Sequence, residues 1–275
     1  MTEYGLGRFG VWRGYKGFAP EEAAELEDLG YGALWLGGSP PAALETVEPL
    51  LAATETVTVA TSIVNIWTAP VKELAESFHR IEDRYPGRFL LGIGVGHPEA
   101  VSAYRKPYDA LVEYLDDLDA AGVPRSRRAV AALGPRMLEL ARDRALGALP
   151  YFSTPEHTRR AREVLGSRSL LAVEQKLVVD DDPERARALG RPVVARYLGL
   201  ANYVNNLRRL GYEDSDVAEP GSDRLIDALA VHGTPARVAE QVVAHLDAGA
   251  DHVALQALEE DYLTPLRELA PLLPR

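Results

Sequence analysis

The sequence contains no cysteine, which excludes disulfide bonds and thiolate metal ligands. Lysine is scarce as well: only four of the 30 basic residues are lysines, so few candidates exist for Schiff-base chemistry. The formal net charge is −11 at pH 7. Nucleic acids and anionic membrane surfaces attract basic proteins, so this acidic balance argues against both as partners.

Long apolar runs are missing too. No stretch approaches the roughly 20 apolar residues that a membrane-spanning helix needs. Residues 1–4 show neither the basic start nor the apolar stretch of a signal peptide. The absence of cysteine suits a reducing compartment, and we therefore expect a cytoplasmic protein.

What the sequence does contain is a repeated unit made of an amphipathic helix, a glycine at its exit and an apolar strand. One unit begins with Thr234 as the expected N-cap and Pro235 at the first helical position, and its helix stops at Gly249. The units predict eight short strands, near residues 6–12, 33–37, 56–63, 88–95, 128–133, 147–152, 170–179 and 251–256.

Eight strands that alternate with helices predict an α/β fold with a parallel sheet. At 275 residues this count favours a closed (β/α)8 TIM barrel over an open doubly wound sheet. We expect a single domain over residues 1–275. The interval before the last unit is too long for the repeat, which predicts a mostly helical insertion at roughly 183–232, after the seventh strand.

Three glycines, Gly92, Gly94 and Gly96, alternate at the end of the fourth expected strand. A dinucleotide fingerprint has the spacing Gly-x-Gly-x-x-Gly and follows the first strand, so both the spacing and the position argue against it. At the carboxyl end of a barrel strand, Gly94 and Gly96 would let a planar ring approach the backbone. The alternative for both is glycine that permits tight packing at a barrel corner.

Four segments resemble, in order and spacing, the bacterial luciferase-like superfamily, and within it the coenzyme F420-dependent oxidoreductases: LGYGALWLGG, TVTVATSIVNIWTAP, GRFLLGIGVGHPE and AALGPRMLELA. The resemblance implies a TIM barrel whose mouth holds a flavin or deazaflavin. It implies an F420-dependent oxidoreductase that moves a hydride between the deazaflavin and a small organic substrate, and it leads us to expect a homodimer. Two alternatives stay open: an FMN-dependent luciferase-like monooxygenase, and a barrel that binds flavin or deazaflavin without turnover.

The resemblance also implies where the cofactor lies. Several relatives carry a non-prolyl cis peptide behind the ring on the third strand, and the matching positions here are Ser62 and Ile63. In relatives the loops after the fifth and sixth strands hold the cofactor phosphate, and here each places a helix N-terminus at the mouth, which suits an anion. The cofactor-binding candidates are Ser62, Ile63, Asn65, Gly94, Gly96, Gly134, Pro135, Arg136, Ser153 and Thr154. Thr154 is also predicted to cap the helix that follows it.

Many relatives place an Asp–His pair or a Glu at the mouth, whereas this chain has Gly37-Gly38-Ser39 after the second strand. His97 is then the candidate catalytic residue, because an imidazole exchanges protons near neutral pH. The substrate-binding candidates are Trp12, Trp67, Asn202 and Tyr203, for which packing is the alternative role.

Three further expectations concern residues outside the expected site. No two histidines have the His-x-x-x-His spacing, so we expect no metal site. Lys176 lies in the seventh strand, between Gln175 and Leu177, and this alternation predicts a side chain directed out of the barrel core. Trp35 is expected between the strand layer and the helix layer.

Overall fold

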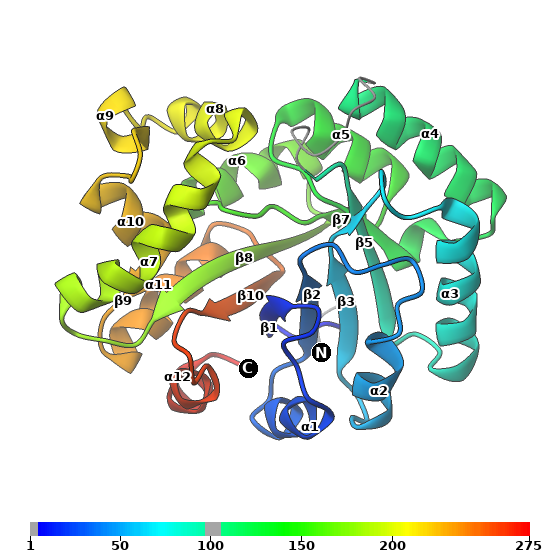
Figure 1. Cartoon of the computed structure of the whole chain (residues 1–275), viewed down its shortest axis with the longest axis horizontal. Coiled ribbons are helices and arrows are strands. Elements are labelled where there is room, and N and C mark those ends of the chain that lie inside the picture. Colours follow the sequence, from blue (N-terminus) through cyan, green and yellow to red (C-terminus); the bar gives the residue numbers. More distant parts are fainter. Residues whose placement is uncertain (1–4, 97–105) are drawn as a thin grey trace.

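The computed structural model describes residues 5–96 and 106–275. Its parallel strands close into a barrel (Figure 1). The strands are β1 (Phe9–Gly14), β2 (Ala33–Gly37), β3 (Thr58–Ser62), β4 (Val64–Asn65), β5 (Phe89–Gly94), β6 (Arg128–Val130), β7 (Gly147–Ala148), β8 (Leu170–Val178), β9 (Ala230–His232) and β10 (His252–Ala257). β10 pairs with both β8 and β1, which closes the ring, and β4 continues β3 along β5. The predicted (β/α)8 TIM barrel is therefore confirmed.

Helices follow the strands and cover the outside of the barrel (Figure 1). They are α1 (Pro20–Asp28), α2 (Val47–Ala52), α3 (Val71–Arg84), α4 (Pro107–Ala120), α5 (Pro135–Arg144), α6 (Pro155–Leu165), α7 (Pro183–Leu198), α8 (Ala201–Arg209), α9 (Asp214–Val217), α10 (Asp223–Leu229), α11 (Pro235–Asp247) and α12 (Leu263–Leu269), with 3-10 turns at Arg125–Arg127 and Ala270–Leu272. As expected, α11 begins at Pro235, and the Thr234 hydroxyl accepts a hydrogen bond from the Arg237 backbone. Among the described residues, no helix has the length and apolar character needed to cross a bilayer.

Two apolar layers hold the barrel together. The larger cluster packs the outward face of the strands against the helices, and the smaller one fills the barrel interior. Trp35 belongs to the interior cluster, so its expected place between strands and helices is wrong. Its indole Nε1 donates to Nε2 of His252 across the inside of the barrel, at 2.9 Å. Both faces of β2 are buried, and periodicity therefore could not distinguish inside from outside.

The expected insertion contains α7, α8, α9, α10 and β9, which lie together on one side of the barrel (Figure 1). β9 pairs with the end of β8, whereas β7 pairs with the start of β8. β9 was not expected, because its three residues are too few to show an alternating pattern. β7 is shorter than the expected strand 147–152, which contains Pro150, a residue without a backbone N–H to donate.

Candidate functional site

The interior core of the barrel ends in exposed apolar groups at the carboxyl ends of the strands. Trp12 and Ile63 pack on the interior cluster and remain partly exposed. The Trp12 ring covers Gly37, where a Cβ atom would lie 1.9 Å from Trp12 Cζ2. A Cβ atom at Gly94 would lie 2.8 Å from the Ala131 methyl group and 3.1 Å from Ile63 Cγ1. These residues form an apolar floor at the mouth of the barrel, and close packing alone accounts for the glycine at position 94.

The strand that ends in Ser62 is interrupted there. The Ser62–Ile63 peptide bond is cis, as the resemblance implied. Ser62 is half-buried at the rim, and its neighbour Ile63 belongs to the apolar floor.

The next part of the rim is held by side-chain hydrogen bonds to the backbone. Asn65 Oδ1 accepts from the Trp67 backbone N–H at 3.0 Å, and the Trp67 indole donates to the Val95 carbonyl at 2.8 Å. Gly96 has a φ of +57°, and a Cβ atom there would lie 2.6 Å from Asn65 Nδ2. The structure thus brings Asn65, Trp67 and Gly96 together, with local contacts that account for each. His97, the candidate catalytic residue, lies outside the described residues.

Two helix N-termini meet the rim on the next strands. Gly134 is the N-cap of α5, and Thr154 is the N-cap of α6, with its hydroxyl accepting from the His157 backbone N–H at 3.4 Å. The expected capping role of Thr154 is confirmed. The His157 ring ties the two loops together, because its Nε2 donates to the Leu133 carbonyl at 3.0 Å. Helix N-termini carry partial positive charge, so this pair of loops suits an anion.

Three buried polar atoms lie where α8 packs on these loops. They are Ser153 Oγ, His157 Nδ1 and Asn206 Nδ2, and none has a hydrogen-bond partner among the described residues. Tyr203 and Leu207 of α8 pack with Phe152 and Leu133 in the same apolar cluster, which places the three atoms around one interface. Buried polar groups are rarely left unsatisfied in proteins, so each of these atoms has room in its hydrogen bonding for a ligand or for water.

Two arginines bring positive charge near these loops, one from α8 in the insertion and one from α6. Arg209 of α8 lies beside Gly134: a Cβ atom there would be 3.9 Å from Arg209 Nη2. Arg160 donates to the Arg209 carbonyl at 2.7 Å. Burial lowers the pKa of His157, and Arg209 and Arg160 lower it further. The predicted Arg136 instead stacks its guanidinium over Tyr108 on α4, at 4.4 Å from the ring centre, and Pro135 is exposed at the start of α5.

A buried ion pair on β8 lies beside the loop that follows β7, under the ring of Tyr151. Lys176 has no exposed surface, and its Nζ lies 3.0 and 2.9 Å from the two carboxylate oxygens of Glu174. The ammonium also lies 4.0 Å from the centre of the Tyr151 ring. The expectation that Lys176 points out of the core is therefore wrong: the outward side chain is Gln175, which bonds His245 of α11 at 2.8 Å.

Of the two substrate candidates on α8, only one faces the barrel. Tyr203 is buried against Phe152, with ring centres 5.2 Å apart, whereas Asn202 is exposed. Trp12 lies at the mouth, and its ring centre is 5.5 Å from that of Tyr151. The sequence analysis missed His157, Glu174 and Arg209.

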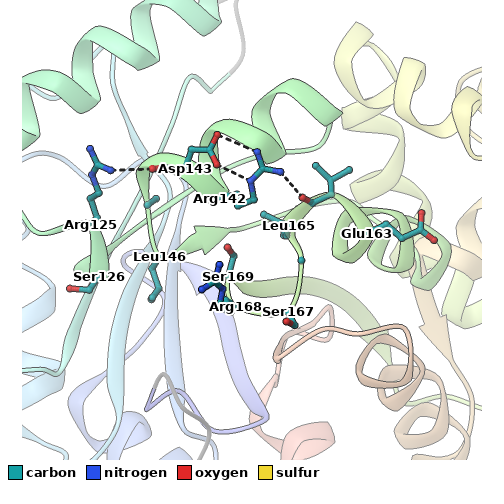
Figure 2. Close-up of a pocket in the computed structure, with 13 residues that line it drawn as sticks. Arg125, Ser126, Arg142, Asp143, Leu146, Glu163, Leu165, Ser167, Arg168 and Ser169 are labelled. Carbon is teal, nitrogen blue, oxygen red and sulfur yellow. Dashed lines mark hydrogen bonds and ion pairs between the residues drawn. The ribbon is translucent and has the colours of Figure 1, made fainter.

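A hollow of about 890 Å³ lies at the opposite end of the barrel, before β6, β7 and β8 (Figure 2). Arginine side chains there bond the ends of α5 and α6: Arg125 reaches the Asp143 carbonyl, and Arg142 reaches the Val164 carbonyl. These contacts satisfy helix carboxyl ends, where cations are favoured. In TIM barrels active sites lie at the carboxyl ends of the strands, so we place the candidate site at the mouth of the barrel and not in this hollow. Within the described residues, no three His, Asp or Glu side chains are grouped closely enough to hold a metal ion.

Comparison with known proteins yields a family match over most of the chain. Residues 6–122 and 113–252 match the family described as luciferase-like monooxygenase. No curated protein matches the chain significantly.

Three solved structures share the fold over nearly their whole length. An F420-dependent secondary alcohol dehydrogenase, bound to an F420–acetone adduct, is 14% identical with a TM-score of 0.76, and 98% of each chain is covered. A coenzyme F420-dependent tetrahydromethanopterin reductase from Methanopyrus kandleri is 17% identical with a TM-score of 0.73, covering 97% of this chain and 98% of that one. The oxygenating constituent of 3,6-diketocamphane monooxygenase from Pseudomonas putida, in complex with FMN, is 14% identical with a TM-score of 0.70, covering 98% and 99%.

Proposed function

The chain belongs to the luciferase-like monooxygenase family, and on that premise we propose that it is an F420-dependent oxidoreductase. It transfers a hydride between the deazaflavin and a small organic substrate. The observation that carries the proposal is that two helices begin at the barrel rim, at Gly134 and Thr154, next to the buried unpartnered hydroxyl of Ser153. We call this part of the rim the anion site, and a cofactor with a flat ring and a phosphate-bearing chain needs such a site as well as an apolar surface.

The residues present fit the phosphate. Two helix N-termini, at Gly134 and Thr154, supply partial positive charge. Ser153 Oγ and Asn206 Nδ2 are buried donors without a partner among the described residues, and Arg209 adds a full charge. A phosphate oxygen that accepts from these groups would remove the cost of leaving them unsatisfied.

When bound, the deazaflavin supplies a hydride at its central ring carbon. The residues that would hold the ring are Trp12 and Ile63, which offer apolar contact, and Ser62 and Asn65, which stand at the rim. The end of β2 carries Gly37, Gly38 and Ser39, and proton exchange with the substrate is therefore assigned to His97, which follows β5.

The second candidate is an FMN-dependent monooxygenase of the same family. FMN and F420 share the ring shape and the ribityl phosphate, so the residues that suit the phosphate of one suit that of the other. The 3,6-diketocamphane enzyme, similar in fold to this chain, holds FMN. The motif resemblance to the F420-dependent branch is what favours F420. A barrel that binds the cofactor without turnover is the third possibility.

The deciding experiment is a spectroscopic titration of the purified protein with F420 and with FMN, followed by isotopic hydride exchange. We expect F420 to bind more tightly than FMN and the loaded protein to exchange hydride with a small alcohol or carbonyl compound. Tight FMN binding without F420 binding would establish the monooxygenase alternative instead. A loaded protein that exchanges hydride with no donor or acceptor would favour the non-catalytic barrel.

A further inference from the structure

The Glu174–Lys176 ion pair is the most deeply buried charged group at the mouth, and the proposed hydride transfer does not use it. Both side chains point into the barrel from β8, and they are 4% and 0% exposed. The carboxylate and the ammonium already bond each other, and the carboxylate also accepts from the Phe152 backbone, so protein contacts rather than a ligand engage the pair. Removing a charge from water is unfavourable even when the ion is paired, which raises the question of what the pair holds in place.

Glu174 is bonded twice to the loop that follows β7. Its backbone N–H donates to the Pro150 carbonyl at 3.3 Å, and its carboxylate Oε2 accepts from the Phe152 backbone N–H at 3.3 Å. Phe152 has a φ of +61°, in the left-handed region that residues other than glycine seldom occupy. A side-chain acceptor on the strand therefore fixes a backbone conformation that the loop does not favour by itself.

The turn at Phe152 decides where the next two residues lie. Ser153 carries the buried unpartnered hydroxyl, and Thr154 begins α6. We propose that the Glu174–Lys176 pair is a positioning device for the anion site, with the Glu174 carboxylate clamping the Phe152 amide so that Ser153 and the start of α6 face the cofactor phosphate. This inference rests on the proposed function.

Lys176 favours the charged carboxylate form of Glu174, which is the form that accepts the hydrogen bond from the Phe152 amide. Burial raises the pKa of Glu174, and the Lys176 ammonium opposes that rise. Burial likewise lowers the pKa of Lys176, and the Glu174 carboxylate opposes that change. The Tyr151 ring face, 4.0 Å from Nζ, adds a cation–π contact. A charged acceptor binds an amide more strongly than a neutral one does.

The test compares two double variants that both remove the buried charges. In E174Q/K176M the amide oxygen at position 174 still accepts from the Phe152 backbone N–H. In E174M/K176M the Phe152 N–H has no side-chain acceptor at position 174. The readout is phosphate preference, which is the affinity for F420 divided by that for the same deazaflavin without its phosphate, with FMN and riboflavin measured in parallel. Thermal unfolding of each variant, without ligand, shows whether the fold is kept.

We expect E174Q/K176M to keep phosphate preference within about threefold of the wild type, and E174M/K176M to lose at least about tenfold, with the affinity for phosphate-free ligands nearly unchanged. A folded E174M/K176M with wild-type preference overturns the inference, and so does an equal loss in both variants. If E174M/K176M does not fold, E174Q is compared with E174L. Lys176 has lost its partner in both of these variants, and an unpaired buried amine loses its proton rather than remain charged. The two variants therefore differ only in whether position 174 offers an acceptor to Phe152. A wild-type protein that binds none of the four ligands refutes the proposed function itself.

Discussion

His252 should make the protein sensitive to mild acid. The ring is fully buried inside the barrel, where its Nδ1 donates to the Gly7 carbonyl at 2.9 Å and its Nε2 accepts from the Trp35 indole at 2.9 Å. If Nε2 were protonated, its N–H would face the Trp35 indole N–H, and neither donor would have an acceptor in a site that water does not reach. Burial accordingly lowers the pKa of His252 to about 4.

The sign of the effect follows from proton linkage. The unfolded chain takes up a proton on His252 near pH 6.5, whereas the folded chain does so only near its lowered pKa of about 4. The contribution to stability is complete above pH 6.5 and is lost as the pH falls toward 4. Between about pH 8 and pH 5.5 this histidine alone removes about 1.4 kcal/mol from the free energy of unfolding.

The assay is urea unfolding of the wild type and of His252→Gln at these two pH values. Glutamine can still bond Gly7 and Trp35 but does not titrate. The loss of stability on acidification should therefore be about 1.4 kcal/mol smaller in the variant, whatever its absolute stability. His79→Gln, at an exposed site on α3, controls for the substitution. Equal losses in wild type and His252→Gln, within about 0.5 kcal/mol, would refute the reasoning.

Three further substitutions have matched controls. Lys176→Met leaves the buried Glu174 carboxylate unpaired and should destabilise the fold by about 3–5 kcal/mol in chemical denaturation, against less than about 0.5 kcal/mol for exposed Lys72→Met. Arg209→Gln should lower the affinity for F420 or FMN about tenfold in fluorescence titration and leave the affinity for the phosphate-free forms unchanged. The neighbouring Arg208→Gln is the control, and equal affinities of the two variants would contradict the anion site. Gly92→Ala should lower the free energy of unfolding by about 1–3 kcal/mol in thermal unfolding, because the new Cβ atom would lie 1.9 Å from the Thr61 carbonyl oxygen. Gly14→Ala is the matched control, because a Cβ atom at Gly14 meets open space.

The barrel could be predicted because its signals are local. Proline marks the first turn of the helices that begin at Pro135, Pro155 and Pro235, and a glycine with positive φ follows the last turn of two of them, at Gly166 and Gly249. The strand positions followed from the spaces between the helices. What escaped prediction was β9, which exists only because β8 extends beyond β7 and leaves an edge to pair.

The burial pattern of β8 explains why the sequence analysis predicted the wrong direction for the Lys176 side chain. All nine of its residues are buried, and both of its faces carry polar side chains near the carboxyl end. Glu174 and Lys176 face the barrel interior, whereas Gln175 faces α11 and bonds His245. Period-two alternation predicts which residues share a face, but not which face looks inward when both are covered.

The candidate site was only half accessible to sequence reasoning. The capping role of Thr154 and the cis bond at Ser62 were expected from local pattern and from resemblance, whereas the roles of these residues in binding remain predictions. Arg209 was missed because its place beside Gly134 depends on how α8 packs, which no spacing in the chain reveals. His157 was missed because its bond to the Leu133 carbonyl, which joins the loops before α5 and α6, links residues 24 positions apart in the chain.

These contacts imply that the two halves of the barrel mouth have different origins. The half around Ile63, Asn65 and Gly94 is made by strand ends and short loops, whose geometry is set by the barrel itself. The half around Ser153 depends on the insertion, because Tyr203, Asn206 and Arg209 all come from α8. A displacement of α8 would therefore remove charge and buried donors from the anion site while leaving the apolar floor intact. Affinity for a phosphate-bearing ligand should follow the packing of α8, and affinity for the ring alone should not.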